Sequence, residues 1–334
     1  MQNYIVQDKE TIKMPCGTFS GVCSAASYPS GELEGIRLNA GNAVPTGAGL
    51  LIPAYEETPR RKFKYSVEFH KNGMVKAVAL NSQQEISTPL GDFPAELVTF
   101  YDTGEINRFF PLDGKISGFW SEEDEMSLAV PLSLDLGFTQ FKAAVNGIAF
   151  WKSGGVRSIS IYPGEIIKAR TLYGSIRTRR GLSLYESGEL ESLEPASPFF
   201  LKTPIGRLAA FDPNASGMHA DSCSLGFEPD GRVKKLTASS NRIKHQAPGE
   251  KAQVFEPAEA LSMLDDESTE IVGLELLFDY VKNQASILKD GVSWTFPMNE
   301  KDFSIEFLYR EASSFSCSQS SCAACHLCGG SSRA

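Results

Sequence analysis

The chain has 334 residues, of which 42% are hydrophobic and 22% are charged, a composition typical of a folded protein and not of a disordered one. The formal net charge is −9, and no basic stripe alternates with aromatic residues, so we expect no nucleic-acid partner. No stretch approaches 18 consecutive apolar residues and the first 13 residues lack the apolar core of a secretory signal, so we expect no membrane span, a cytoplasmic location and reduced cysteines.

Residues 1–62 contain the first, divergent copy of a phrase that recurs along the chain. This copy reads YPSGELEGI (Tyr28 to Ile36), and it is followed by the Gly/Pro-rich stretch NAGNAVPTGAGLLIP and a charged joint, EETPRRK. We interpret the region as a divergent first repeat that ends in a Gly/Pro-rich joint.

Residues 63–245 carry the clear copies of this phrase, which has the form Phe-x-x-x-Gly-x-apolar. Each copy ends an apolar strand in an aromatic residue or Leu, turns on a polar pair plus Gly, and returns as a second strand. Gly fits the turn because a positive φ costs it little. The copies predict a hairpin repeat array and are FHKNGMVKAV, FYDTGEINRF, FWKSGGVRSI, LYESGELESL and FEPDGRVKKL.

A second phrase, Thr-Pro-apolar-Gly, precedes several copies. It reads TPLG at Thr88 to Gly91 and TPIG at Thr203 to Gly206, with degenerate versions at Met14 to Gly17 and Thr171 to Gly174. Its Gly precedes the hairpin Gly by 13 or 14 residues in three units (17 to 31, 91 to 104, 174 to 188) and by 25 in the last (206 to 231). This spacing predicts a repeated unit with one insertion.

Residues 246–312 lack the hairpin phrase and predict capping strands for the array, or alternatively a separate small binding domain. The segment Pro257 to Asp266 predicts a short helix, because Pro257 suits a first helical position and Ala258, Leu261 and Leu264 would share one face. We therefore expect an all-β fold of repeated antiparallel hairpins, forming an elongated twisted sheet or open β-solenoid with a small cap that contains one short helix.

The acidic run Ser121 to Glu125 is interpreted as a solvated loop.

Residues 313–334 form a Ser/Gly-rich, flexible tail with four clustered cysteines, Cys317, Cys322, Cys325 and Cys328. Thiolates at such spacing bind soft metals, so these four residues are candidate ligands for zinc and, less favoured, for an iron–sulfur cluster. No single ligand template fits the spacing. Redox chemistry of the thiols and an inert tail remain alternatives.

Other signals for chemistry are weak. Asp212 to Gly217 (DPNASG) partly matches a calcium loop, but an Asx turn is the simpler interpretation. His219 and Asp221 follow, in what we expect to be a solvated loop tip. The sequence contains no standard catalytic motif; a glycosidase could pair carboxylates from different strands, which a sequence cannot show. Trp151 is expected to pack between adjacent hairpins.

The phrases FYDTGEINRFFPLDGKISGFW and FHKNGMVKAVAL resemble the variant MORN repeats of bacterial proteins, over roughly residues 63–236. The resemblance implies an elongated antiparallel sheet used in protein or lipid-headgroup contacts, and it implies no catalytic residue. We therefore expect a non-enzymatic scaffold that binds a protein or other large partner along the sheet face. The alternatives are a carbohydrate-active enzyme with a groove on the sheet, and a metal-handling protein that acts through the cysteine tail.

Overall fold

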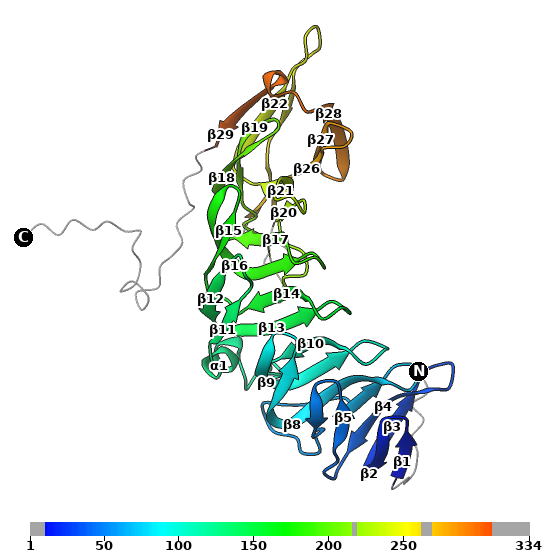
Figure 1. Ribbon diagram of the computed structural model, residues 1–334. Coiled ribbons are helices and arrows are strands. Elements are labelled where there is room, and N and C mark those ends of the chain that lie inside the picture. Colours follow the sequence, from blue (N-terminus) through cyan, green and yellow to red (C-terminus); the bar gives the residue numbers. More distant parts are fainter. Residues whose placement is uncertain (1–10, 216–218, 262–268, 309–334) are drawn as a thin grey trace, which may run out of the picture.

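A computed structural model describes residues 11–215, 219–261 and 269–308 and is built almost entirely of antiparallel β-hairpins. Within these ranges lie one α-helix, α1 (Glu122–Ser127), and one 3₁₀ turn, η1 (Glu300–Asp302). The molecule is elongated, and its strands follow one another in chain order from the N-terminal to the C-terminal end (Figure 1). The expected all-β fold of repeated hairpins in an elongated sheet is confirmed.

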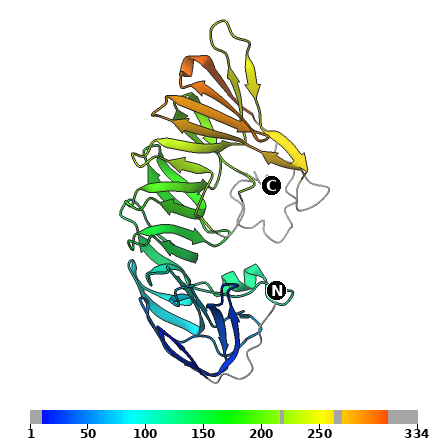
Figure 2. The ribbon, with the colours of Figure 1, turned by 90° about the vertical axis from the view of Figure 1, so that its right-hand side faces the viewer.

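A single large antiparallel sheet forms the spine of the molecule, and its strands stack along a curved axis (Figure 2). Every strand of this sheet pairs with at least one strand adjacent to it in the chain, as a hairpin array requires. The order across the sheet is β3 (Val22–Ser27), β4 (Leu33–Leu38), β7 (Val67–Phe69), β8 (Val75–Thr88), β9 (Gly91–Phe100), β10 (Ile106–Phe110), β13 (Val145–Phe150), β14 (Val156–Ile161), β16 (Gly174–Leu184), β17 (Leu190–Pro195), β20 (Leu225–Phe227), β21 (Val233–Ala238), β26 (Leu274–Asp279), β27 (Gln284–Lys289) and β28 (Val292–Pro297).

Short hairpins form a second layer along one face of this sheet. They are β1 (Thr11–Met14) with β2 (Gly17–Ser20), β5 (Val44–Thr46) with β6 (Gly49–Leu51), β11 (Leu132–Asp135) with β12 (Gln140–Ala143), β15 (Ile167–Thr171) with the start of β16, and β18 (Phe199–Thr203) with β19 (Gly206–Ala210). Towards the C-terminal end, β22 (Asn241–His245), β23 (Gln253–Phe255) and β29 (Phe303–Phe307) form a three-stranded sheet, and β24 (Ala258–Leu261) pairs with β25 (Thr269–Val272).

The Thr-Pro-apolar-Gly phrase and its degenerate versions form turns of these short hairpins and the turn that joins β8 to β9. In four turns the Thr hydroxyl donates a hydrogen bond of 2.7–2.9 Å to the carbonyl of the Gly three residues later: at Thr46, Thr88, Thr171 and Thr203. Met14 pairs with Gly17 in the same register but has no hydroxyl. The two recurrent phrases therefore mark two kinds of turn. The aromatic turns lie in the large sheet, and the Thr turns close the short hairpins and the far end of the β8–β9 pair.

The hydrophobic core lies between the two layers. One row of side chains crosses the large sheet from strand to strand, and every member is at most 1% exposed: Ile36, Val67, Val78, Val98, Phe109, Ile148, Ile159, Leu182, Leu193, Leu225, Leu236, Leu276 and Ile287. The short hairpins cover this row with buried residues such as Ile86, Ile176 and Leu208. Period-two alternation in the strands produces this single continuous core.

Hydrogen bonds between side chains and the backbone connect each hairpin of the large sheet to the next. The first residue of each turn contacts the carbonyl of the aromatic residue or Leu that ends the strand of the following hairpin. Tyr28, Tyr101 and Tyr185 do so through their hydroxyls at 2.8 Å, to Phe69, Phe150 and Phe227. His70 Nε2 and Trp151 Nε1 lie 3.0 and 3.1 Å from the carbonyl oxygens of Phe100 and Leu184. The expected packing of Trp151 between hairpins is confirmed.

Two expectations for local structure are wrong. Residues 258–261 form strand β24, which pairs with β25, and not the start of a helix; residues 262–266 lie outside the described residues. The acidic run near residue 122 is not a loop but α1, with a capping box in which Ser121 and Asp124 bond reciprocally. No helix in the described ranges is long and apolar enough to cross a membrane.

Candidate functional site

The face of the large sheet opposite the core is partly covered by the insertion that the repeat spacing predicts. The segment 220–224 runs across β14, β16 and β17. The Ala220 amide donates to Ser160 Oγ at 2.9 Å, and the Cys223 amide donates to Ser192 Oγ at 3.1 Å. Both serines are at most 2% exposed. The middle of this face is therefore filled by the chain itself.

A groove of about 590 Å³ opens at the edge where the hairpin turns lie. Its apolar wall comes from both layers: Leu136, Phe138, Leu172, Leu190, Phe227 and Pro229. Leu172 belongs to a short-hairpin turn and lies so close to the turn of the next sheet hairpin that a Cβ on Gly231 would be 3.0 Å from its side chain. Leu172 is nevertheless 72% exposed.

A second groove of about 650 Å³ lies beside the first, because both are lined by Pro229 and Asp230. Tyr280 is one of its lining residues. The Tyr280 hydroxyl donates to the Val233 carbonyl at 2.9 Å. The Arg232 guanidinium lies over the Tyr280 ring, 3.9 Å from its centroid. Val281 stands at the rim of this groove with 98% of its area exposed. Together the two grooves extend over three successive hairpin turns, in Ser187–Leu190, Glu228–Gly231 and Asp279–Val281.

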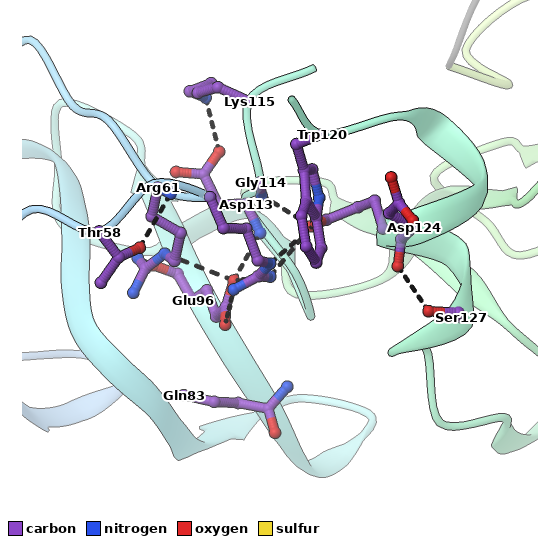
Figure 3. Close-up of polar contacts among 12 residues, drawn as sticks. Thr58, Arg61, Gln83, Glu96, Asp113, Gly114, Lys115, Trp120, Asp124 and Ser127 are labelled. Carbon is purple, nitrogen blue, oxygen red and sulfur yellow. Dashed lines mark hydrogen bonds and ion pairs between the residues drawn. The ribbon is translucent and has the colours of Figure 1, made fainter. Parts of the chain in front are cut away.

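A buried charged cluster occupies the joint between the first repeat and the array (Figure 3). The Arg60 guanidinium lies between two carboxylates and bonds each through two nitrogens. The bonds measure 2.9 and 2.6 Å to Glu96, on β9, and 2.8 and 3.0 Å to Glu125, on α1. Arg61 adds a contact of 3.5 Å to Glu96 and donates to the Glu96 carbonyl at 3.1 Å. The cluster thus ties the joint, a strand and the helix together.

The loop before α1 supplies the other hydrogen bonds to the Glu125 carboxylate. Glu125 accepts hydrogen bonds of 2.7 Å from the Gly114 amide and from Trp120 Nε1. A Cβ on Gly114 would lie 1.9 Å from a Glu125 oxygen, so this approach requires glycine. Burial opposes the ionisation of Glu125, but the bonds from Arg60, Gly114 and Trp120 outweigh it and lower its pKa.

The carboxylates of the cluster are not available as an acid–base pair. Each oxygen of Glu125 accepts two hydrogen bonds, and both oxygens of Glu96 bond to Arg60. Burial raises the pKa of the neighbouring Asp113, whose carboxylate is paired with Lys115 at 2.7 Å. The geometry is that of a structural ion-pair network.

The cysteines predicted to bind metal, Cys317, Cys322, Cys325 and Cys328, lie outside the described residues. In the parts of the chain that the structure describes, no group of three or more His, Cys, Asp or Glu side chains could hold a metal ion. The three cysteines there, Cys16, Cys23 and Cys223, are free thiols.

The weak calcium signal corresponds in part to an Asx turn, since the Asn214 amide bonds Asp212 Oδ1 at 2.9 Å; residues 216–218 lie outside the described ranges. His219 and Asp221 are exposed, as expected of a loop, and the Asp221 side chain is 45% exposed. Asp221 nevertheless accepts two bonds of 2.5 and 2.6 Å from Arg108 and another from Ser158. It helps to hold the insertion on the sheet.

Sequence reasoning missed the charged cluster and both grooves. The capping-box pattern at Ser121 was a usable signal for α1. Arg60 and Glu125 are 65 residues apart, however, and nothing in the local sequence connects them. Comparisons with protein-family models, with curated proteins and with solved structures found no match to this chain.

Proposed function

We propose that this protein is a non-enzymatic repeat scaffold that binds an extended segment of a protein partner along the edge formed by its hairpin turns. The observation that carries the proposal is the pair of adjoining grooves on either side of Pro229. Apolar grooves with exposed rims are typical of peptide-binding surfaces.

The spacing of the hairpins suits a particular partner conformation. Successive hairpins are two strands apart in the sheet, which corresponds to about 9.6 Å at the usual strand separation. A polyproline II segment advances about 9.3 Å per turn of three residues. A partner with an apolar residue at every third position would therefore place one side chain in each groove, and aromatic walls such as Phe138 and Tyr280 suit this mode.

The turn edge is a better candidate than the open sheet face, which was the surface expected from the sequence. The segment 220–224 fills the middle of that face through hydrogen bonds to buried serines. A partner lying there would have to displace these contacts, whereas Leu172 and Val281 are already exposed.

The test is a double variant, Leu172→Asp with Val281→Asp, which places a charge in each groove. Because both side chains are exposed, the fold should be kept, as circular dichroism can verify. Proteins captured from extract by the wild-type chain should be lost with this variant. The matched control is Leu50→Asp with Val254→Asp, two residues that are 63% and 54% exposed away from the grooves and should not change capture.

Equal capture by the groove variant and the control would contradict the proposal. A carbohydrate-active enzyme is the alternative outcome, and it predicts turnover in a glycosidase panel that survives both groove substitutions. The charged cluster gives that alternative little support, since both carboxylates that bond Arg60 are committed to ion pairs.

A further inference from the structure

A cavity of about 340 Å³ lies next to the charged cluster, on the face of the sheet opposite the core. One wall is apolar and comes from Leu97, Phe110, Leu112 and Ile116. The other wall is polar and includes Asp113, Asn146, Tyr162 and His219. The cavity therefore offers one apolar surface faced by hydrogen-bonding groups, at the small end of the usual size of ligand sites.

Tyr162 is the most informative residue of the polar wall. The residue as a whole is 4% exposed and lines the cavity, and its hydroxyl makes no hydrogen bond within the described part of the chain. The hydroxyl is not among the buried polar atoms that lack a partner, so it is open to the cavity and can bond to a molecule there. Burial, together with the charge of Glu125, raises the pKa of Tyr162 to about 12, so the hydroxyl keeps its proton and can donate.

The neighbouring polar groups are also unused. The amide of Asn146 and the ring of His219 make no hydrogen bond among the residues that the structure describes. Burial and the nearby Arg108 lower the pKa of His219, so at neutral pH the ring is uncharged and can both donate and accept. The His219 ring lies 6.1 Å from that of Phe110.

The charges around the cavity largely cancel, which argues against an ionic ligand. Asp113 is paired with Lys115, and Glu125 is paired with Arg60. The exposed Glu122 at the rim is the remaining acid of the lining. A fully apolar ligand would leave Tyr162, Asn146 and His219 without partners.

We propose that this cavity binds a small, uncharged polyhydroxy ligand about the size of one sugar ring. The C–H face of the ring would lie on the apolar wall at Phe110. Its hydroxyls would bond to Tyr162, Asn146 and the free oxygen of Asp113. This site is separate from the grooves at the hairpin edge and does not depend on the proposed scaffold function.

The experiment is saturation-transfer NMR on the full chain with D-glucose, D-galactose, D-mannose, N-acetyl-D-glucosamine and myo-inositol as probes, and ethanolamine as a cationic comparison. We expect transfer to at least one polyhydroxy probe. Tyr162→Phe removes only the hydroxyl and should weaken the affinity of the protein for that probe about tenfold, the loss expected for one good hydrogen bond. Asn146→Ala should weaken it similarly.

The matched control is Tyr55→Phe, because Tyr55 is half-buried and lies outside the cavity. It should leave the affinity unchanged. The proposal would be overturned by absence of transfer to all five polyhydroxy probes, by binding of ethanolamine alone, or by equal affinity in the wild type, Tyr162→Phe and Asn146→Ala. Circular dichroism of each variant separates loss of binding from loss of fold.

Discussion

Glycine is required at one position of every aromatic turn because the backbone there enters the left-handed region. The φ values of Gly31, Gly73, Gly104, Gly154, Gly188 and Gly231 lie between 81° and 104°. In each turn the Gly amide donates to the carbonyl three residues earlier, and the hairpin closes with a bulge. The divergent copy at Gly31 has the same bonds, so all six copies form one type of turn.

Two adjacent glycines allow a direct test of this requirement. Gly154 has a φ of 90°, whereas Gly155, beside it, has no positive φ. Gly154→Ala should reduce the free energy of unfolding by about 1 kcal/mol or more, because an L side chain resists this conformation. Gly155→Ala is the control: its Cβ would meet other atoms at 3.5 Å or more, so urea melts should show little change. Equal losses in the two variants would mean that backbone strain is not the cause.

Glu125 should make the stability of the protein depend on pH. Its pKa is lowered in the folded state, so its contribution to stability is present above its usual value of about 4.5 and is lost as the pH falls through the folded value. Glu125→Gln leaves Arg60 with one partner fewer in a buried network and should cost about 3 kcal/mol at pH 7. The difference from the wild type should shrink as the pH falls below about 4.5.

The control for this pH effect is Glu122→Gln, on the same turn of helix α1. Glu122 is exposed, and its substitution should change stability by less than about 0.5 kcal/mol. If urea melts give parallel pH profiles for the wild type and Glu125→Gln, the pH dependence of stability does not come from Glu125.

Side-chain contacts, in addition to the backbone hydrogen bonds between strands, connect each hairpin to its neighbours. The Tyr, His or Trp that follows the aromatic position reaches the backbone of the next hairpin in five successive steps, from Tyr28 to Phe227. Basic side chains lie over several of these rings, such as Lys152 over Tyr101 at 5.7 Å. These contacts fix the position of one turn relative to the next.

Tyr185→Phe should show the contribution of one such step. The change removes the hydroxyl that donates to the Phe227 carbonyl at 2.8 Å and leaves a part-buried acceptor without its partner. We expect a loss of about 1 kcal/mol in urea unfolding. Amide hydrogen exchange should increase mainly in β20 and β21. The control Tyr55→Phe should leave both measurements unchanged; unaltered exchange in Tyr185→Phe would show that the contact does not couple the hairpins.

Residues 313–334, which contain the four clustered cysteines, follow the hairpin array in the sequence and lie outside the described residues. The predicted zinc ligands are Cys317, Cys322, Cys325 and Cys328, and the described residues 11–215, 219–261 and 269–308 hold no cluster of metal ligands. We predict about one zinc per chain after anaerobic purification, because four thiolates are a sufficient ligand set.

Deletion of residues 313–334 should remove this zinc and leave the melting of the array unchanged, as elemental analysis and circular dichroism can show. Iron with matching sulfide would instead identify a cluster. Metal-free protein with four freely titrating thiols would reject the site.

The sequence alone determined the fold class and the positions of the turns. This was possible because a hairpin turn depends on residues within about five positions: Gly104 must adopt a positive φ, and Thr88 bonds to Gly91 within its own turn. The alternation of apolar residues likewise set which face of each strand is buried. These local requirements recur, so the array could be recognised from its phrases.

The tertiary structure decided the features that join distant residues. Residues 258–261 form a strand because β25 pairs with them, against a weak helical pattern. Arg60 forms an ion pair with Glu125, 65 residues away in the sequence, and Arg108 forms one with Asp221, 113 residues away. The grooves and the Tyr162 cavity exist because the two layers and the insertion pack around them. Such contacts depend on how whole hairpins are placed, which no short segment of sequence specifies.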